Sequence, residues 1–90
     1  MNELKERPNI GPLIHKQLLE IGVTTFIELQ NLGATGAWEK IYHIDPSSCI
    51  NKLLALEGAI RGIPKKDIDT LSKDDLRQFV RHIKQHKKNL

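Results

Sequence analysis

The sequence predicts an all-α, compact single domain of about five or six short helices, and three observations support this prediction. Apolar residues recur at helical spacing in several segments, short breaks separate these segments, and the one β-like fragment, Val23–Phe26, is too short and unpartnered to build a sheet. The chain has 90 residues, of which 39% are hydrophobic and 28% charged, as is ordinary for a small globular domain. We therefore expect residues 1–90 to fold around one modest core.

The segment from Ile50 to Ile63 is the most tightly specified helix of the chain. Its large apolar residues spread over more than half of the helix circumference, so the helix should be buried on several sides. We expect four of them to be among the most buried residues: Leu53, Leu54, Leu56 and Ile60. Small residues on the opposite side, including Gly58, would let a neighbouring helix approach closely, and Gly62 followed by Pro64 should end the helix.

Two charged side chains interrupt the apolar pattern of this central segment. Glu57 and Arg61 are four residues apart and fall beside the large apolar residues of the helix. We interpret them as a structural ion pair, partly buried, that fixes the packing. A catalytic role for Glu57 as a general base would need a partner that the sequence does not show.

Local signals place the helices of the N-terminal half. A short helix over residues 2–7 should stop before Pro8, because the residue before a proline avoids the α region. A second helix should begin at Pro12, which suits a first helical turn, and should be capped by Gly22. Its apolar residues follow helical spacing: Ile14, Leu18 and Ile21.

Two more helices are expected before the central segment. Thr25 and Glu28 match a capping box, so a short helix should start there and stop at Gly33. A separate amphipathic helix should follow over residues 37–44. Its two large aromatic side chains suit the core better than a base-stacking surface: Trp38 and Tyr42.

The last helix should begin near Leu71 and run to about Lys87. Ser72 is the expected N-cap, and Leu71 would pack back onto Leu76 as a hydrophobic staple. Its apolar positions have helical spacing: Leu76, Phe79, Val80 and Ile83.

Charge is distributed unevenly along the chain. The net charge is +3, yet all 11 acidic side chains precede residue 76. Residues 76–90 carry only cations: Arg77, Arg81, Lys84, Lys87 and Lys88. This pattern is typical of a solvated helix end, since cations stabilise a helix C-terminus, but it also suits an anionic partner such as nucleic acid.

The stretch from Arg7 to Pro12, with the helix that follows it, resembles a helix-hairpin-helix unit. That motif implies contact with the DNA backbone, because hairpin amides and a helix N-terminus present N–H groups to phosphate. Ile10 would be the buried hairpin residue. The candidate binding residues are the amides of Asn9, Gly11 and Leu13, with Lys16 nearby, and the terminal cations Lys84, Lys87 and Lys88.

Two residues depart from the helix-hairpin-helix pattern. Asn9 stands where the first glycine usually lies, and asparagine tolerates the left-handed conformation better than most residues. Leu13 stands where the family often has lysine, and Lys16 lies almost one turn further along the helix.

The chain up to about Leu71 also resembles the C-terminal domain of the TfoX family of bacterial regulators associated with genetic competence. Four stretches carry the resemblance: Pro8–Pro12, Leu19–Val23, Leu29–Ala34 and, above all, Leu53–Gly62. The resemblance implies a helical domain related to helix-hairpin-helix proteins, a regulatory or DNA-associated role, and no catalysis. The resemblance does not include the family's N-terminal domain, and the basic helix over residues 71–90 lies outside the best-matched region.

Other functional sites have little support in the sequence. His82 and His86 share a helix face but have no third metal ligand nearby, and Cys49 suggests no catalytic dyad. Since no phosphate-binding loop, dinucleotide fingerprint or nucleophile elbow is present, we expect no enzyme, no cofactor and no metal.

The expected location is the cytoplasm. No apolar run reaches the length of roughly 18–20 residues that a membrane span needs, and the N-terminal residues show no secretory signal. The single cysteine excludes an internal disulfide framework.

Two functions remain open. The first is a regulatory module that binds the DNA backbone weakly and without reading sequence. The second is a protein-interaction adaptor, which could be a homodimer, in which the hairpin serves only for packing. The hairpin and the basic C-terminus favour the first, whereas Leu13 and the mild net charge favour the second.

Overall fold

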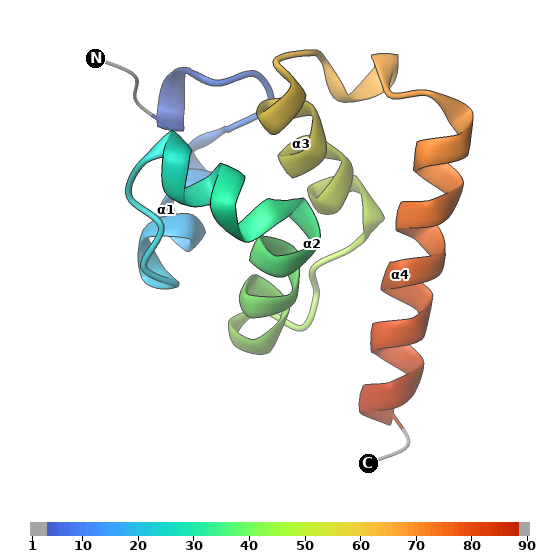
Figure 1. Ribbon diagram of the computed structural model, residues 1–90. Helices are drawn as coiled ribbons and strands as arrows, with labels where there is room; N and C mark the ends of the chain where they lie inside the picture. The colour runs from blue at the N-terminus through green and yellow to red at the C-terminus, as the bar shows by residue number, and fades with distance from the viewer. Residues whose placement is uncertain (1–3, 89–90) are drawn as a thin grey trace.

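The computed structural model describes the backbone of residues 4–88 and the side chains of residues 4–85. This part of the chain is entirely helical, with four α-helices and two short 3₁₀ helices (Figure 1). They are η1 (Leu4–Glu6), α1 (Pro12–Glu20), α2 (Phe26–Ile44), α3 (Ile50–Arg61), η2 (Lys65–Asp67) and α4 (Thr70–Lys88). The all-α prediction is confirmed, but the expected number of helices, five or six, is too high.

The difference arises at Gly33, where two expected helices run on as one. Gly33 has φ of 82° and ψ of 160°, which is not helical, so α2 is kinked there rather than ended. A positive φ of this kind is easily adopted only by glycine. The capping box at the start of α2 is present, since Thr25 Oγ1 accepts a hydrogen bond from the Glu28 N–H and the Glu28 carboxylate accepts one from the Thr25 N–H.

Helix α3 lies at the centre of the fold and contacts both α2 and α4. Leu53, Leu54 and Leu56 are buried as expected. Ile60 is only partly buried, because it packs against the core from its edge. The prediction that Ile60 is among the most buried residues is therefore wrong.

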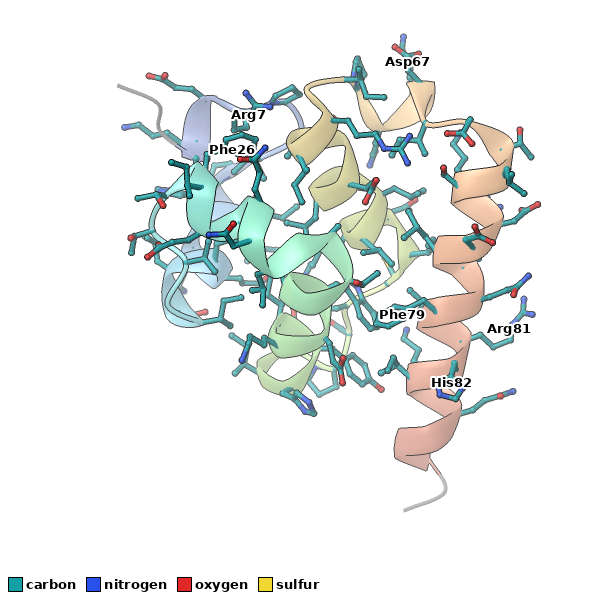
Figure 2. All side chains as sticks on the ribbon, in the orientation of Figure 1. Arg7, Phe26, Asp67, Phe79, Arg81 and His82 are labelled. Atoms are coloured by element: carbon teal, nitrogen blue, oxygen red, sulfur yellow. The ribbon has the colours of Figure 1, made fainter. Side chains whose placement is uncertain are left out.

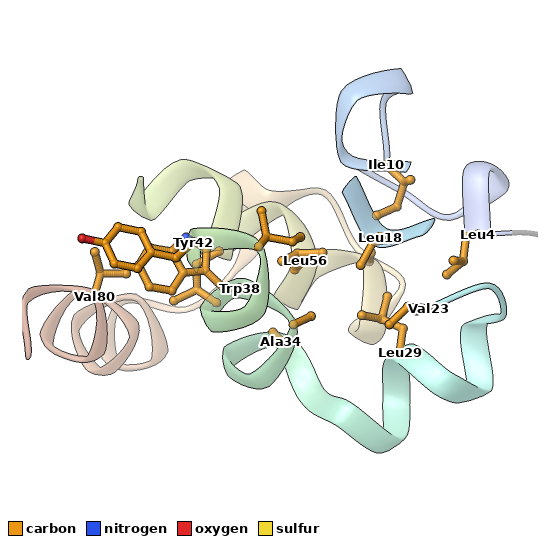
Figure 3. Close-up of a cluster of buried hydrophobic side chains, with 14 residues drawn as sticks. Leu4, Ile10, Leu18, Val23, Leu29, Ala34, Trp38, Tyr42, Leu56 and Val80 are labelled. Atoms are coloured by element: carbon orange, nitrogen blue, oxygen red, sulfur yellow. The ribbon is translucent and has the colours of Figure 1, made fainter. Parts of the chain in front are cut away.

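The hydrophobic core runs the length of the molecule (Figure 3). Leu4, Leu18 and Leu29 form the end near η1 and α1, whereas Trp38, Tyr42 and Val80 form the end near α4. The rings of Trp38 and Tyr42 stack with centroids 5.1 Å apart, and Phe79 meets Trp38 edge-on. The two aromatic residues of α2 are thus core residues, as the sequence indicates.

Helix α4 begins differently from the prediction. It starts at Thr70, so the expected N-cap Ser72 lies inside the helix, where its N–H donates to the Asp69 carboxylate at 3.0 Å. Leu71 is 73% exposed, so it does not act as a staple. The reason is that the chain before α4 is held by Asp69, whose carboxylate is a stronger acceptor than a serine hydroxyl.

Helices α1 and α4 lie on opposite sides of the α2–α3 pair (Figure 1). Two regions that the sequence suggested for one ligand, the hairpin before α1 and the basic end of α4, are therefore far apart. Among the helices described, none has the length and hydropathy required to cross a lipid bilayer.

Candidate nucleic-acid interface

The hairpin between η1 and α1 is a tight turn in which asparagine replaces glycine. Asn9 has φ of 69°, the left-handed conformation that asparagine adopts more readily than most residues. Ile10 next to it is buried, as expected for the apolar residue of the hairpin. Before the turn, the described residues form only the single 3₁₀ turn of η1, so a full helix-hairpin-helix unit stays a prediction.

The Asn9 side chain is fully engaged with the end of α3. Its Nδ2 donates to the carbonyl oxygens of Ile63 at 3.0 Å and Ala55 at 3.4 Å, and its Oδ1 accepts from the Lys65 N–H at 3.2 Å. A Cβ at Gly58 would collide with Asn9 Nδ2 and would lie 2.6 Å from the Ile63 oxygen. The small side of α3 therefore accommodates the hairpin and the chain beyond Gly62, and not a neighbouring helix as the sequence suggested.

Arg7 makes a second tie between the hairpin and α3. Its Nε and Nη2 donate to the Ala59 carbonyl oxygen at 3.0 and 2.8 Å, and its guanidinium lies 3.9 Å from the centroid of the Phe26 ring (Figure 2). The carbonyls of a last helical turn lack intrahelical donors, so Arg7 satisfies one of them. Sequence reasoning missed this contact, because no local pattern links residues this far apart.

The N-terminus of α1 is open. Gly11 is its N-cap and supplies no side-chain hydrogen bond, and the helical positions of Leu13 and Ile14 lack intrahelical acceptors for their N–H groups. The N–H groups of Asn9, Gly11 and Leu13 likewise donate to no other residue within the range 4–88. Leu13 is 58% exposed, and Lys16 is exposed one turn further on.

Two hollows flank the hairpin. The larger, of about 390 Å³, separates the start of α1 from α3 and is lined by Asn9, Gly11, Pro12, Leu13, Ile14, Asn51, Lys52, Ala55 and Lys65. The smaller, of about 260 Å³, is lined by Lys5, Ile10, Gly11, Pro12 and His15. Among the side chains of residues 4–85, neither lining includes an acidic one. The hairpin thus lies between surfaces whose charged groups are basic.

Lys52 contributes its stem to the larger hollow but not a free charge. Its Nζ donates to Gln17 Oε1, Asp45 Oδ2 and Ser48 Oγ at 2.7–3.0 Å. Gln17 also donates to Asp45, so the cluster joins α1, the α2–α3 loop and α3. Hydrogen bonds from the Ser47 hydroxyl, Gln17 and Lys52 hold the pKa of Asp45 far below its usual value.

Glu57 and Arg61 form an ion pair, and Arg61 also contacts two residues near the start of α4. Arg61 Nε lies 2.7 Å from Glu57 Oε2, and its two other nitrogens reach Asp69 at 3.1 Å and Ser72 at 3.0 Å. The hydrogen bonds from Glu57 and Asp69 raise the pKa of Arg61. The Glu57 and Arg61 side chains are 22% and 36% exposed, so the pair is at the surface and links α3 to the start of α4.

Lys84 of α4 does not join the hairpin. It is half-buried, with its Nζ 6.0 Å from the centroid of the Tyr42 ring, and α4 lies on the side of the molecule away from α1 (Figure 1). The side chains of Lys87 and Lys88 lie outside the described residues. The structure therefore brings Asn9, Gly11, Leu13 and Lys16 together and separates them from Lys84. It adds Lys5 and Lys65, which sequence reasoning did not single out.

The other candidate sites gain no support from the described residues, and the side chain of His86 lies outside them. No group of three His, Cys, Asp or Glu side chains within the described part of the chain has a metal-binding arrangement. Cys49 is exposed at the N-cap of α3, where its carbonyl oxygen accepts a hydrogen bond from Trp38 Nε1.

Comparisons with known proteins match the fold and place the chain in a family. A triclinic crystal structure of an uncharacterized protein from Listeria monocytogenes superposes with a TM-score of 0.89 at 35% identity, covering 91% of this chain and 93% of that one. A tetragonal crystal structure of a protein of unknown function from the same organism gives a TM-score of 0.85 at 35% identity, covering 88% and 98%. A comparison with curated protein sequences gave no match.

The model of the TfoX C-terminal domain matches residues 1–80, which include the hairpin, α1, α2, α3 and the first half of α4. The match extends beyond Leu71, where the resemblance in the sequence weakens. The chain belongs to the TfoX C-terminal domain family.

Proposed function

We propose that this chain is a non-catalytic regulatory module that binds the DNA backbone weakly and without sequence preference. The proposed contact is the hairpin at Asn9–Leu13, with Lys16, Lys5 and Lys65 around it. Family membership supports a regulatory or competence-related role, and the hairpin supplies the chemistry.

One observation carries the proposal. The residues at the open N-terminus of α1 and in the hairpin, whose amides at Asn9, Gly11 and Leu13 donate to no other described residue, line hollows whose described linings contain lysine and histidine but no acid. Helix N-termini and free amides attract phosphate, and such contacts orient a protein on DNA without reading bases. The exposed Leu13 stands where a cation would add most to this attraction.

The expected affinity is low. Only a few cations surround the hairpin, so we expect about two to four phosphate contacts, each adding about 0.9 to the magnitude of the log–log salt slope on duplex DNA. Binding should then fall near the 10⁻⁴–10⁻⁶ M that is roughly typical of non-specific complexes.

A fluorescence anisotropy titration with labelled duplex and single-stranded DNA at two salt concentrations tests this function. Leu13→Lys should strengthen binding to duplex DNA, because it adds a cation beside the hairpin amides. Leu19→Lys is the matched control, since Leu19 is an exposed leucine of the same helix outside both hollows. Absence of binding at low salt by the wild type and by Leu13→Lys would contradict the proposal.

A protein-interaction adaptor, including a homodimer, is the second candidate. Its support is a set of large apolar side chains on the surface: Leu13, Leu19, Ile27, Ile44 and Leu71. Exposed apolar residues favour contact with another protein when they gather in one patch. Sedimentation velocity at several concentrations separates the candidates, because a homodimer would show mass action in the absence of DNA.

A further inference from the structure

Lys65 follows α3 in the chain but lies beside the hairpin in space. After Gly62, which has φ of 79°, the chain reverses, and the Lys65 N–H donates to Asn9 Oδ1 at 3.2 Å. Lys65 then lines the larger hollow together with Gly11, Pro12 and Leu13. A residue 56 positions away in the sequence is thus held at the start of α1 by a single side chain.

The Asn9 side chain is suited to this task because it is anchored on both polar atoms. Oδ1 accepts from the Lys65 N–H, and Nδ2 donates to the Ile63 carbonyl two residues earlier. Two hydrogen bonds therefore hold the segment from Ile63 to Lys65. Gly58 leaves the space that this arrangement needs. The backbone of Lys65 is therefore fixed, while its side chain is exposed.

The Lys65 ammonium is available to a ligand. Each ion pair among the described residues involves Lys52, Arg61 or Arg77, and none involves Lys65. Lys66 is also exposed but lines neither hollow, and its carbonyl oxygen accepts a hydrogen bond from Lys73. The two adjacent lysines thus differ in their position relative to the hairpin.

We propose that Lys65 supplies the phosphate-binding cation that the hairpin lacks at Leu13, and that Asn9 is the positioning residue that holds Lys65 there. The inference rests on the proposed binding of DNA at the hairpin. It makes the binding surface composite, with amides from the turn before α1 and a cation from the connection between α3 and α4.

The first test compares two adjacent charges. Lys65→Gln should weaken duplex binding several-fold and reduce the magnitude of the salt slope by about 0.9, the value for one phosphate contact. Lys66→Gln, which removes the same charge one residue along, should change both quantities much less. Equal effects of the two substitutions would overturn the assignment of Lys65 while leaving binding at the hairpin intact.

The second test is a double-mutant cycle with Asn9→Gly. Glycine accepts the positive φ of position 9, so the turn and its amides should persist while the side-chain tie to Lys65 is lost. In the Asn9→Gly background, Lys65→Gln should cost little further affinity, because Lys65 is no longer held beside the hairpin. Additive losses would show that Asn9 does not position Lys65 and would refute that part of the proposal.

A measurement without DNA tests the hydrogen bond between the Lys65 N–H and Asn9 Oδ1 directly. Amide hydrogen exchange at Lys65 should accelerate in Asn9→Gly, whereas exchange at Leu56 in the middle of α3 should match the wild type. Unchanged exchange at Lys65 would refute the positioning role. If the wild type fails to bind duplex DNA at low salt, the proposed function and the role of Lys65 both fail. This result is distinct from the three outcomes above, which remove only the present inference.

Discussion

At position 58, a hydrogen atom is the only side chain that the surroundings accommodate. A Cβ there would meet Asn9 Nδ2, the Ile63 carbonyl oxygen and, at 3.4 Å, the Cα of Lys65. Glycine inside a helix costs about 1 kcal/mol relative to alanine, so its presence in α3 needs a compensating contact. The compensation is the close approach of the hairpin, which places the Asn9 amide over the helix.

Gly58→Ala should therefore destabilise the protein even though alanine favours helix. The clash involves backbone atoms that cannot move aside easily, and overpacking of this kind costs about 1–3 kcal/mol, which exceeds the gain in helix propensity. The measurement is the free energy of unfolding from urea denaturation.

Gly36→Ala in α2 is the matched control for this substitution. Its Cβ would approach only the end of the Leu32 side chain, at 3.1 Å from Cδ1, which can adjust. A neutral or stabilising effect is expected there. Equal effects at positions 36 and 58 would contradict the role assigned to the hairpin contact.

At the scale of the elements, the joint between α3 and α4 depends on Arg61. This guanidinium bonds Glu57 on its own helix and Asp69 and Ser72 at the start of α4. Exposure of 36% places it among surface ion pairs, so the several kcal/mol that a buried pair would lose on truncation do not apply.

Arg61→Gln should lower stability modestly, since exposed ion pairs contribute about 0.2–1 kcal/mol each. Arg77→Gln is the control, because Arg77 pairs only with Asp74 within α4. Thermal melts in low and high salt give the melting temperature of each variant. The difference in melting temperature between the two variants should shrink as salt screens the charges. A larger loss for Arg77→Gln would contradict the idea that Arg61 joins the two helices.

The elements could be predicted from the sequence to the extent that their signals are local. The Thr25–Glu28 capping box and the stop at Gly62 each depend on neighbours within a few residues, and each is present, whereas Gly33 kinks α2 instead of ending it. Helix α4 begins within one residue of the expected Leu71, but its cap differs, because Asp69 and Ser72 are both candidate caps and the structure shows the Asp69 carboxylate accepting the Ser72 N–H.

The candidate site was predictable only in part. The unusual Asn9 and the open start of α1 could be inferred from the turn sequence itself. The partners Lys65 and Ala59 could not, because they lie 56 and 52 residues from the residues that bind them and follow no periodic pattern. Sequence reasoning offered Lys16 as a substitute for the missing lysine and the end of α4 as a source of diffuse attraction, and the structure places α4 on the other side of the molecule.

For the whole molecule, carboxylates set the response to acid. Hydrogen bonds from the Ser72 N–H and hydroxyl and from Arg61 lower the pKa of Asp69 to about 2, and the pKa of Asp45 is also lowered. A carboxylate with a lower pKa in the folded state than in the unfolded state stabilises the fold above the unfolded value, and this stabilisation is lost as pH falls through the folded value.

The melting temperature should therefore decline as pH falls from about 4 towards 2, the interval between the usual pKa of aspartate and that of folded Asp69. Asp69→Asn should melt lower than the wild type at neutral pH and show a shallower decline. Asp67→Asn is the control, since the Asp67 carboxylate accepts no hydrogen bond from residues 4–85. Parallel curves for wild type and Asp69→Asn would contradict the assignment.

The ties from Arg7 and Asn9 to α3 also bear on the order in which the chain acquires its structure. Helices α2 and α3 are neighbours in sequence and can pair early, whereas the hairpin must find partners more than 45 residues away, a loop closure that slows folding. The hairpin should consequently dock late and detach first when the molecule opens partially. Its amides acquire their arrangement only when α3 is already in place, so a partly opened molecule should retain most of its core but lose the surface that we propose for phosphate.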